Sequence, residues 1–208
     1  MVTRLDTVVI GGGAMGSATA WALARRGRDV TLLEQFAPGH TNGASHGTTR
    51  NFNPGYADPH FVALLASSVA LWARLGEEAG IDPITRTGVV NFGDPVGQEA
   101  IARALPLVGI GAEHLGADEA RERWRGINFV GPVLHLPDGG QLNPDEALPA
   151  FQRVASAAGA EIRHGVRVRE LHIIDDDLAE LVVETATGTE TLRARTVVCT
   201  AGAWTRAL

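Results

Sequence analysis

The segment from Thr7 to Gln35 restricts the fold of this 208-residue chain more than any other part of it. It reads TVVIGGGAMGSATAWALARRGRDVTLLEQ, and its first apolar run, residues 8–10, is typical of a strand buried on both faces. A glycine-rich turn follows, and the alanine-rich stretch after it predicts a helix to about Arg26 that Gly27 ends. The apolar run 30–33 predicts a second buried strand. This order of strand, turn, helix and strand predicts an α/β fold with a parallel sheet.

Three glycines in the turn, Gly11, Gly13 and Gly16, have the G-x-G-x-x-G spacing of a dinucleotide-binding site. The first permits a tight turn, the second lets a pyrophosphate approach the backbone, and the third lets the helix lie close to the strand. The N-terminal amides and dipole of the helix would face the pyrophosphate. Glu34, 18 residues after Gly16, ends the second strand, where an acid accepts hydrogen bonds from ribose hydroxyls and repels a 2′-phosphate. The whole arrangement favours a dinucleotide site over a purely structural turn, but it does not choose between FAD and NAD.

Composition limits the partners and the compartment. The chain has 18 basic and 24 acidic side chains and a net charge of −6, which argues against nucleic acids and anionic membranes as partners. Its single cysteine, Cys199, lies in the apolar run TVVCTAG, so we expect a buried core thiol and no internal disulfide framework. A reducing, cytoplasmic location is the default expectation.

One uncharged stretch, Thr7 to Ala24, has 18 residues and the length of a short membrane span. Three consecutive glycines at 11–13 interrupt it, and glycine is unfavourable inside a helix. A secretory signal would carry its positive charge before the apolar stretch, whereas Arg25 and Arg26 follow it here. We therefore expect no membrane span.

The remaining pattern predicts further helices and strands. A helix begins at Asp58-Pro59, an N-cap acid followed by a proline in the first turn. We interpret its apolar stripe as core; the stripe comprises Phe61, Leu64, Leu65, Ser68, Leu71, Trp72 and Leu75. Further expected helices span 98–105 (stopped by Pro106), 118–124 and 144–158, and expected strands span 85–93, part of 131–144, a meander over 161–184, and 196–200. The seven histidines show no metal-ligand spacing and no nucleophile elbow is present, so metalloenzyme and hydrolase functions have little support.

A polar segment, HTNGASHGTTRNF, occupies His40 to Phe52 and suits either a solvated loop or a loop packed against a ligand. Together with the glycine fingerprint, it resembles the FAD-dependent amine and amino-acid oxidases built like D-amino-acid oxidase. The nearest branch is that of monomeric sarcosine oxidase and N-methyltryptophan oxidase. Supporting matches are TGVVNFG at 87–93, RWRGI at 123–127 and AGAW at 201–204. Because family members are much longer, the resemblance implies an N-terminal portion that ends at Leu208.

The resemblance implies FAD as the cofactor and a place beside the flavin ring for the polar loop. Small residues there would let the backbone amides of Gly43 and Ser45 approach the cofactor. Thr49 and Arg50 match positions near the flavin, where a guanidinium favours the electron-rich reduced ring, and His46 matches a histidine beside it. Arg50 and His46 are therefore the candidate catalytic residues, with an ordinary solvated loop as the alternative interpretation.

The candidate cofactor-binding residues extend over the whole chain. By the same resemblance, Val168 contacts the adenine end, and residues 201–204 return to the cofactor, although Trp204 alone suits the core equally well. The complete set is Gly11, Gly13, Ala14, Met15, Gly16, Glu34, Gln35, Gly43, Ser45, Thr49, Arg50, Val168, Ala201, Gly202 and Trp204.

Asn53 is the candidate substrate-binding residue. Family members that act on simple N-methyl amino acids carry an arginine at this position to clasp the substrate carboxylate, whereas asparagine offers only a neutral hydrogen bond. The family's covalent flavin cysteine and oxygen-activating lysine would lie beyond Leu208.

These observations combine into one expected architecture and function. We expect a Rossmann-like FAD-binding domain, with a parallel sheet and a β-meander, made of pieces 1–83 and 141–208 around part of an inserted α+β substrate domain, 84–140. The expected reaction is oxidation of the C–N bond of a secondary or primary amine, such as an N-methyl amino acid. Water would hydrolyse the imine, and oxygen would reoxidise the flavin to give hydrogen peroxide. The partners would be the amine and oxygen, with no obligate protein partner. The alternatives are an NAD-dependent dehydrogenase and a non-catalytic dinucleotide-binding fragment.

Overall fold

The computed structural model describes residues 3–208, which divide into two compact units. The first unit combines the segment up to Thr48 with Pro144–Leu208, and the second is Thr49–Asn143. The expected division differs at both boundaries: the second boundary falls between residues 143 and 144 instead of 140 and 141, and residues 49–83 lie in the second unit instead of the cofactor-binding piece. They belong to the second unit since strand β3 (Arg50–Phe52) pairs with β8 (Gly140–Leu142).

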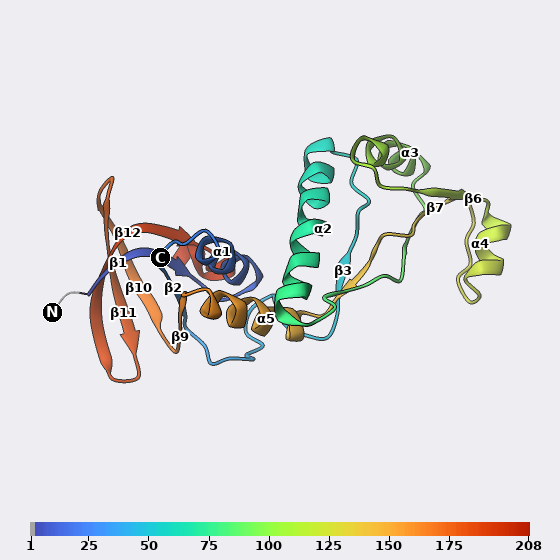
Figure 1. Ribbon diagram of the computed structural model, residues 1–208. Helices are drawn as coiled ribbons and strands as arrows, with labels where there is room; N and C mark the ends of the chain where they lie inside the picture. The colour runs from blue at the N-terminus through green and yellow to red at the C-terminus, as the bar shows by residue number, and fades with distance from the viewer. Residues whose placement is uncertain (1–2) are drawn as a thin grey trace. The chain divides into compact units, whose positions relative to one another are not determined.

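The first unit is built on a six-stranded sheet with the order β10-β11-β12-β1-β2-β9. The strands are β1 (Thr3–Ile10), β2 (Val30–Glu34), β9 (Glu161–His164), β10 (Arg167–Asp175), β11 (Leu178–Thr185) and β12 (Gly188–Cys199). Strands β12, β1, β2 and β9 are mutually parallel, whereas β10, β11 and β12 form an antiparallel meander (Figure 1). The α/β class, the parallel sheet and the meander predicted from the sequence are confirmed.

Two helices of the first unit pack against each other, and the local sequence explains their limits. Helix α1 (Ala14–Ala24) contacts α5 (Pro144–Ala157) through the rings of Trp21 and Phe151, whose centroids are 5.4 Å apart. Gly27, with φ of 71°, turns the chain out of α1, as predicted from its place after the helix. A short 3-10 helix, η2 (Gly202–Ala207), follows β12.

One hydrophobic cluster of the first unit joins residues of the parallel strands to residues of the meander. Its buried residues are Val8, Ile10, Leu33, Val166, Val168, Leu181, Val183, Leu192 and Ala194. The expected burial of Cys199 is wrong, because its side chain is exposed. Strand β11 pairs with β12 only as far as Ala194, so the last residues of β12 have β1 as their one paired neighbour and are less enclosed.

The second unit contains two three-stranded sheets, β3-β8-β4 and β5-β7-β6, with three α-helices and a 3-10 helix. The elements not yet given are α2 (Pro59–Ala79), β4 (Ile84–Thr85), β5 (Val89–Phe92), α3 (Pro95–Ala104), η1 (Leu105–Val108), β6 (Glu113–Leu115), α4 (Ala117–Arg123) and β7 (Val133–Leu136). The expected strand 85–93 is split into β4 and β5, because Gly88 has a φ of 73° that an extended strand does not allow.

Helix α3 also differs from its expected limits of 98–105. It begins at Pro95, because the Asp94 side chain accepts a hydrogen bond from the Gly97 amide at 3.0 Å and caps the first turn. The α-helix ends at Ala104, just before Pro106 as expected, and Pro106 lies in the first turn of η1, where its missing N–H removes no hydrogen bond.

Helix α2 begins at the expected Asp58 cap, but only part of its predicted apolar stripe is buried: Leu75 lies in the core, and Leu65, Ser68 and Trp72 are half-buried. Asp58 accepts a hydrogen bond from the His60 amide at 2.8 Å. The helix contacts η1, and its buried residues are Val62, Leu75 and Gly76, of which Leu75 belongs to the predicted stripe. Of the predicted stripe, Phe61, Leu64 and Leu71 are 57%, 67% and 49% exposed.

The helices of residues 3–208 include none with both the length and the apolar character that a membrane crossing needs.

Candidate dinucleotide site

A cavity of about 770 Å³ opens in the first unit beyond the carboxyl ends of β1, β2 and β12. Five segments line it: the glycine turn after β1, the loop after β2, the first turns of α5, the connection from β9 into β10, and the residues after β12. Ligands of open α/β sheets bind at this edge, because the loops that follow parallel strands converge there.

The glycine turn is closely packed at two of its glycines and open at the third. Gly11 has a φ of 101°, and a Cβ there would lie 2.7 Å from the Thr200 carbonyl oxygen. A Cβ on Gly16 would overlap the carbonyl oxygen of Gly11. Gly13, the N-cap of α1, lines the cavity, and a Cβ there would meet only Ser45, at 3.4 Å or more. The turn therefore fits a diphosphate that approaches the backbone at Gly13.

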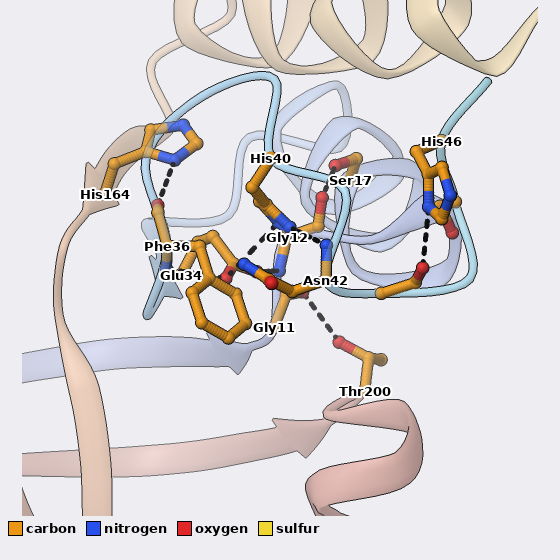
Figure 2. Close-up of polar contacts among 12 residues, drawn as sticks. Gly11, Gly12, Ser17, Glu34, Phe36, His40, Asn42, His46, His164 and Thr200 are labelled. Atoms are coloured by element: carbon orange, nitrogen blue, oxygen red, sulfur yellow. Dashed lines mark hydrogen bonds and ion pairs between the residues drawn. The ribbon is translucent and has the colours of Figure 1, made fainter. Parts of the chain in front are cut away.

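Glu34 is a buried acidic group of the cavity, only 6% exposed. Its Oε2 accepts a hydrogen bond from the Gly12 amide at 2.6 Å, and its Oε1 accepts one from the Phe36 amide at 2.9 Å (Figure 2). Nε2 of His40 lies 3.6 Å from the same Oε1. A carboxylate has about four acceptor positions, so Glu34 keeps capacity for two ribose hydroxyls while it holds the turn.

Two polar side chains that the sequence did not single out, Gln152 and His164, add to the wall. Gln152 of α5 donates to the Gly12 carbonyl oxygen at 3.2 Å and to Ser17 Oγ at 3.1 Å. His164, at the end of β9, has Nε2 3.0 Å from Gln152 Oε1. Its Nδ1 lies 3.2 Å from the Phe36 carbonyl oxygen (Figure 2). A signal existed for His164, because it ends a strand parallel to β2 and so reaches the same edge of the sheet as Glu34. Gln152 carries no such signal.

Thr200 joins the end of β12 to the glycine turn. Its Oγ1 donates to the carbonyl oxygens of Ile10 at 2.8 Å and Gly11 at 3.0 Å (Figure 2). Its amide donates to the Ile10 carbonyl oxygen at 2.9 Å. The chain after β12 thus returns to the glycine turn, and the contact of residues 201–204 with the cofactor stays a prediction.

The structure brings most of the candidate residues to this one cavity. The lining includes Gly11, Gly13, Ala14, Met15, Glu34, Gln35, Gly43, Ser45, His46, Val168, Ala201, Gly202 and Trp204. Ser45 Oγ accepts a hydrogen bond from the Ala14 amide at 3.1 Å, and the ring of Trp204 contacts Phe36 with centroids 5.6 Å apart. Gly16 does not line the cavity, which agrees with its expected role in packing the helix on the strand. Their binding roles stay predictions.

The remaining candidates, Thr49, Arg50 and Asn53, belong to the second unit. Thr49 Oγ1 donates to Gln141 Oε1 at 3.0 Å, and Arg50 Nη1 donates to the Thr49 carbonyl oxygen at 2.8 Å. Asn53 Oδ1 accepts a hydrogen bond from the Gly55 amide at 2.8 Å, which leaves its amide nitrogen as the neutral donor expected for a substrate.

His46 lies in the first unit, with Nδ1 2.7 Å from the Gly43 carbonyl oxygen (Figure 2). The same loop is tied to the start of α5, because the Gly47 amide donates to Asp145 Oδ1 at 2.7 Å and the Asp145 amide donates back to the Gly47 carbonyl oxygen at 3.2 Å. The loop is therefore held in place along the cavity wall.

The pKa of one carboxyl group is lowered on β9, the strand that ends at His164, but at the opposite end of that strand from the cavity. A hydrogen bond from Arg163, at 2.8 Å, is the main reason that the pKa of Glu161 lies below its usual value, and Thr31 contributes a weaker one. Glu161 does not line the cavity, and its charge is paired with Arg163 outside the site.

The sheet, the glycine turn and the buried acid after the second strand define a dinucleotide-binding α/β protein of the Rossmann type. The chain belongs to the FAD dependent oxidoreductase family, whose model matches residues 6–208. The family resemblance predicted from the sequence is confirmed.

Individual relatives and structures agree with this family. The chain is 33% identical to monomeric sarcosine oxidase of Bacillus sp. (strain B-0618) over 98% of its own length and 53% of the relative. It is 31% identical to N-methyl-L-tryptophan oxidase of Citrobacter koseri over 99% of its length and 55% of that protein. Among solved structures, the open form of NikD, an unusual amino acid oxidase essential for nikkomycin biosynthesis, gives a TM-score of 0.82 at 32% identity, covering all of this chain and 53% of NikD. The chain thus spans about half the length of these relatives.

Proposed function

We propose that this chain binds FAD in the cavity of the first unit and belongs to an enzyme that oxidises the C–N bond of an amine. One observation carries the proposal: a single cavity brings together the glycine turn, Glu34 and the polar loop with His46. The family match supports FAD over NAD.

Different residues of the cavity suit different parts of the dinucleotide. The amide of Gly13 and the N-terminus of α1 suit the diphosphate, and Glu34 suits the hydroxyls of the adenosine ribose. Val168, buried beside the core, suits the adenine end, and residues 201–204 follow the cofactor toward the flavin. When bound, FAD would serve as the acceptor of two electrons from the substrate.

The proposed substrate is a secondary or primary amine such as an N-methyl amino acid, as the names of the sarcosine and N-methyltryptophan oxidases suggest. Oxidation removes two electrons and two protons from the C–N bond, water hydrolyses the imine to an amine and a carbonyl compound, and oxygen takes the electrons to give hydrogen peroxide. Arg50 would stabilise negative charge on the reduced cofactor. Asn53 would offer only a neutral hydrogen bond to the substrate, so an amine without a carboxylate is the alternative substrate that we propose. The proposed location is cytoplasmic, and the proposed partners are small molecules.

The first test is the colour and turnover of protein expressed from the complete gene. We expect a yellow protein whose flavin absorbance bleaches with an amine substrate. Sarcosine, N-methyltryptophan, pipecolate and non-carboxylate amines should be screened for peroxide release. In the same assay, Arg50→Ala should slow flavin reduction on the order of 100-fold, the cost of losing one group that stabilises developing charge.

Arg74→Ala is the matched control, because Arg74 is an exposed arginine on α2, outside the candidate site. A colourless protein whose activity requires added NAD would support a dehydrogenase instead. Equal flavin reduction rates in Arg50→Ala and Arg74→Ala would show that Arg50 has no role at the flavin and belongs to an ordinary solvated loop.

The second test asks what the 208-residue chain does by itself. The turn, Glu34 and Val168 all lie in the first unit, so we expect weak binding of the adenosine half of FAD and no amine oxidation. Calorimetry should show that ADP binds more tightly than riboflavin. Riboflavin binding tighter than ADP, or robust turnover, would contradict this expectation.

A further inference from the structure

Both the amide and the carbonyl oxygen of Gly12 form hydrogen bonds with side chains, two of which, Glu34 and Gln152, come from distant parts of the chain. The Gly12 amide donates to Glu34, whereas the Gly12 carbonyl oxygen accepts hydrogen bonds from Ser17 Oγ at 2.9 Å and Gln152 Nε2 at 3.2 Å. Ser17 is fully buried, and Gln152 lies 140 residues away from Gly12 in sequence. The turn is therefore fixed by long-range contacts as well as by its glycines.

The carbonyl of Gly12 and the amide of Gly13 belong to the same trans peptide unit, so they point in opposite directions. The groups that hold the Gly12 oxygen therefore also set the direction of the Gly13 N–H. Within residues 3–208, this N–H has no hydrogen-bond partner, and Gly13 lines the cavity. An amide that is held in direction but has no partner is suited to a ligand oxygen.

The orientation of the Gln152 side chain follows from its neighbours. The Gly12 carbonyl oxygen can only accept, so the amide nitrogen of Gln152 must face it. The reverse orientation would place two oxygens 3.2 Å apart. Gln152 Oε1 then faces Nε2 of His164 at 3.0 Å. The tautomer of His164 that carries its hydrogen on Nε2 donates to this oxygen and keeps the amide in this orientation.

Gln152 also determines the hydrogen bond of Ser17. Because Ser17 Oγ accepts from Gln152 at 3.1 Å, its single hydrogen is free to donate to the Gly12 oxygen at 2.9 Å. Removing the Gln152 amide would thus loosen both contacts to the Gly12 carbonyl.

We propose that Gln152 is a positioning residue for the diphosphate of the cofactor: by holding the Gly12 carbonyl, it aims the Gly13 N–H into the cavity. The inference rests on the proposed binding of FAD. It assigns to α5 and β9, through Gln152 and His164, a part in phosphate recognition that the glycine fingerprint alone does not contain.

The test compares ADP with adenosine, because only ADP carries the diphosphate. Calorimetry on the 208-residue chain should give a ratio of the two affinities for the unmodified protein and for Gln152→Met, which keeps the side-chain length but has no donor. We expect the ratio to fall about fivefold to tenfold, the effect of one hydrogen bond, while adenosine affinity stays within about twofold. Ser156→Ala, an exposed position one turn later on α5, should leave both affinities unchanged.

The outcomes separate this inference from the proposed function. If the unmodified chain binds neither ADP nor FAD, the proposed function fails and the inference with it. If it binds ADP and Gln152→Met leaves the ratio unchanged, or lowers both affinities equally, only the positioning role is overturned.

A second measurement uses the unmodified chain, so it does not depend on whether the variant folds. In NMR spectra, the Gly13 amide should shift on addition of ADP and not of adenosine, and a Gly13 amide that ignores ADP would refute the proposal.

Discussion

Gly16→Ala is expected to destabilise the first unit and to abolish ADP binding. A Cβ at this position overlaps the Gly11 carbonyl oxygen and lies 2.6 Å from Thr200 Oγ1, so the start of α1 must move away from β1. Overpacking of this kind typically costs about 1–3 kcal/mol and occasionally more. We expect the upper end of that range, because the clash is with backbone and not with a flexible side chain. Chemical denaturation gives the free energy of unfolding, and calorimetry gives the affinity for ADP.

Gly111→Ala is the control for Gly16→Ala. Gly111 is exposed, has no atom within 4 Å of a built Cβ, and does not have a positive φ. Alanine there should leave the stability unchanged or raise it by about 0.4–1 kcal/mol, because it restricts the unfolded chain. If Gly16→Ala unfolds at the same denaturant concentration as the unmodified chain and still binds ADP, the close packing of α1 on β1 is not required for the site.

The sequence predicted the part of the site that local rules encode. The turn at Gly11, the helix behind Gly16 and the acid at the end of β2 lie within one βαβ unit, where glycine conformation and strand burial determine the geometry. The expected parallel sheet followed from the same pattern and agrees with the observed pairing of β1 with β2 and β12.

The contacts that complete the site could not be predicted in this way. Gln152 reaches Gly12 from 140 residues away, and its position on α5 is half-buried, so no periodic pattern separates it from an ordinary surface residue. His164 acts through a glutamine side chain and a carbonyl oxygen, and neither contact has a signature in the local sequence. Such side-chain networks depend on the tertiary arrangement of strands and helices.

Burial was the property that the sequence pattern misjudged most clearly. Phe61, Leu64 and Leu71 belong to the predicted apolar stripe but are exposed, whereas Leu75 of the same stripe is buried together with Val62 and Gly76. Periodicity shows that a helix has an apolar face and does not show which neighbour covers that face. The boundary at residue 83 was misplaced for a related reason, because the pairing of β3 with β8 is a long-range contact.

Glu34→Ala is expected to lower the affinity for ADP about 10- to 100-fold, since hydrogen bonds to a charged group contribute about 1.5–3 kcal/mol. The carboxylate is 6% exposed and holds the amides of Gly12 and Phe36, so alanine removes the ribose acceptor and leaves both amides unpaired. We therefore also expect a lower free energy of unfolding, and ADP binding should be measured at a temperature where the variant is folded.

Glu34→Gln separates the charge of Glu34 from its hydrogen bonds. The amide of glutamine keeps one acceptor oxygen and has no charge, so the affinity for ADP should lie between those of the unmodified chain and Glu34→Ala. The repulsion of a 2′-phosphate should disappear with the charge, and the preference for ADP over 2′-phosphorylated ADP should narrow. Glu77→Gln, an exposed acid on α2, is the control and should change neither affinity. If Glu34→Ala binds ADP as tightly as Glu77→Gln does, Glu34 serves only to hold the turn and the ribose lies elsewhere.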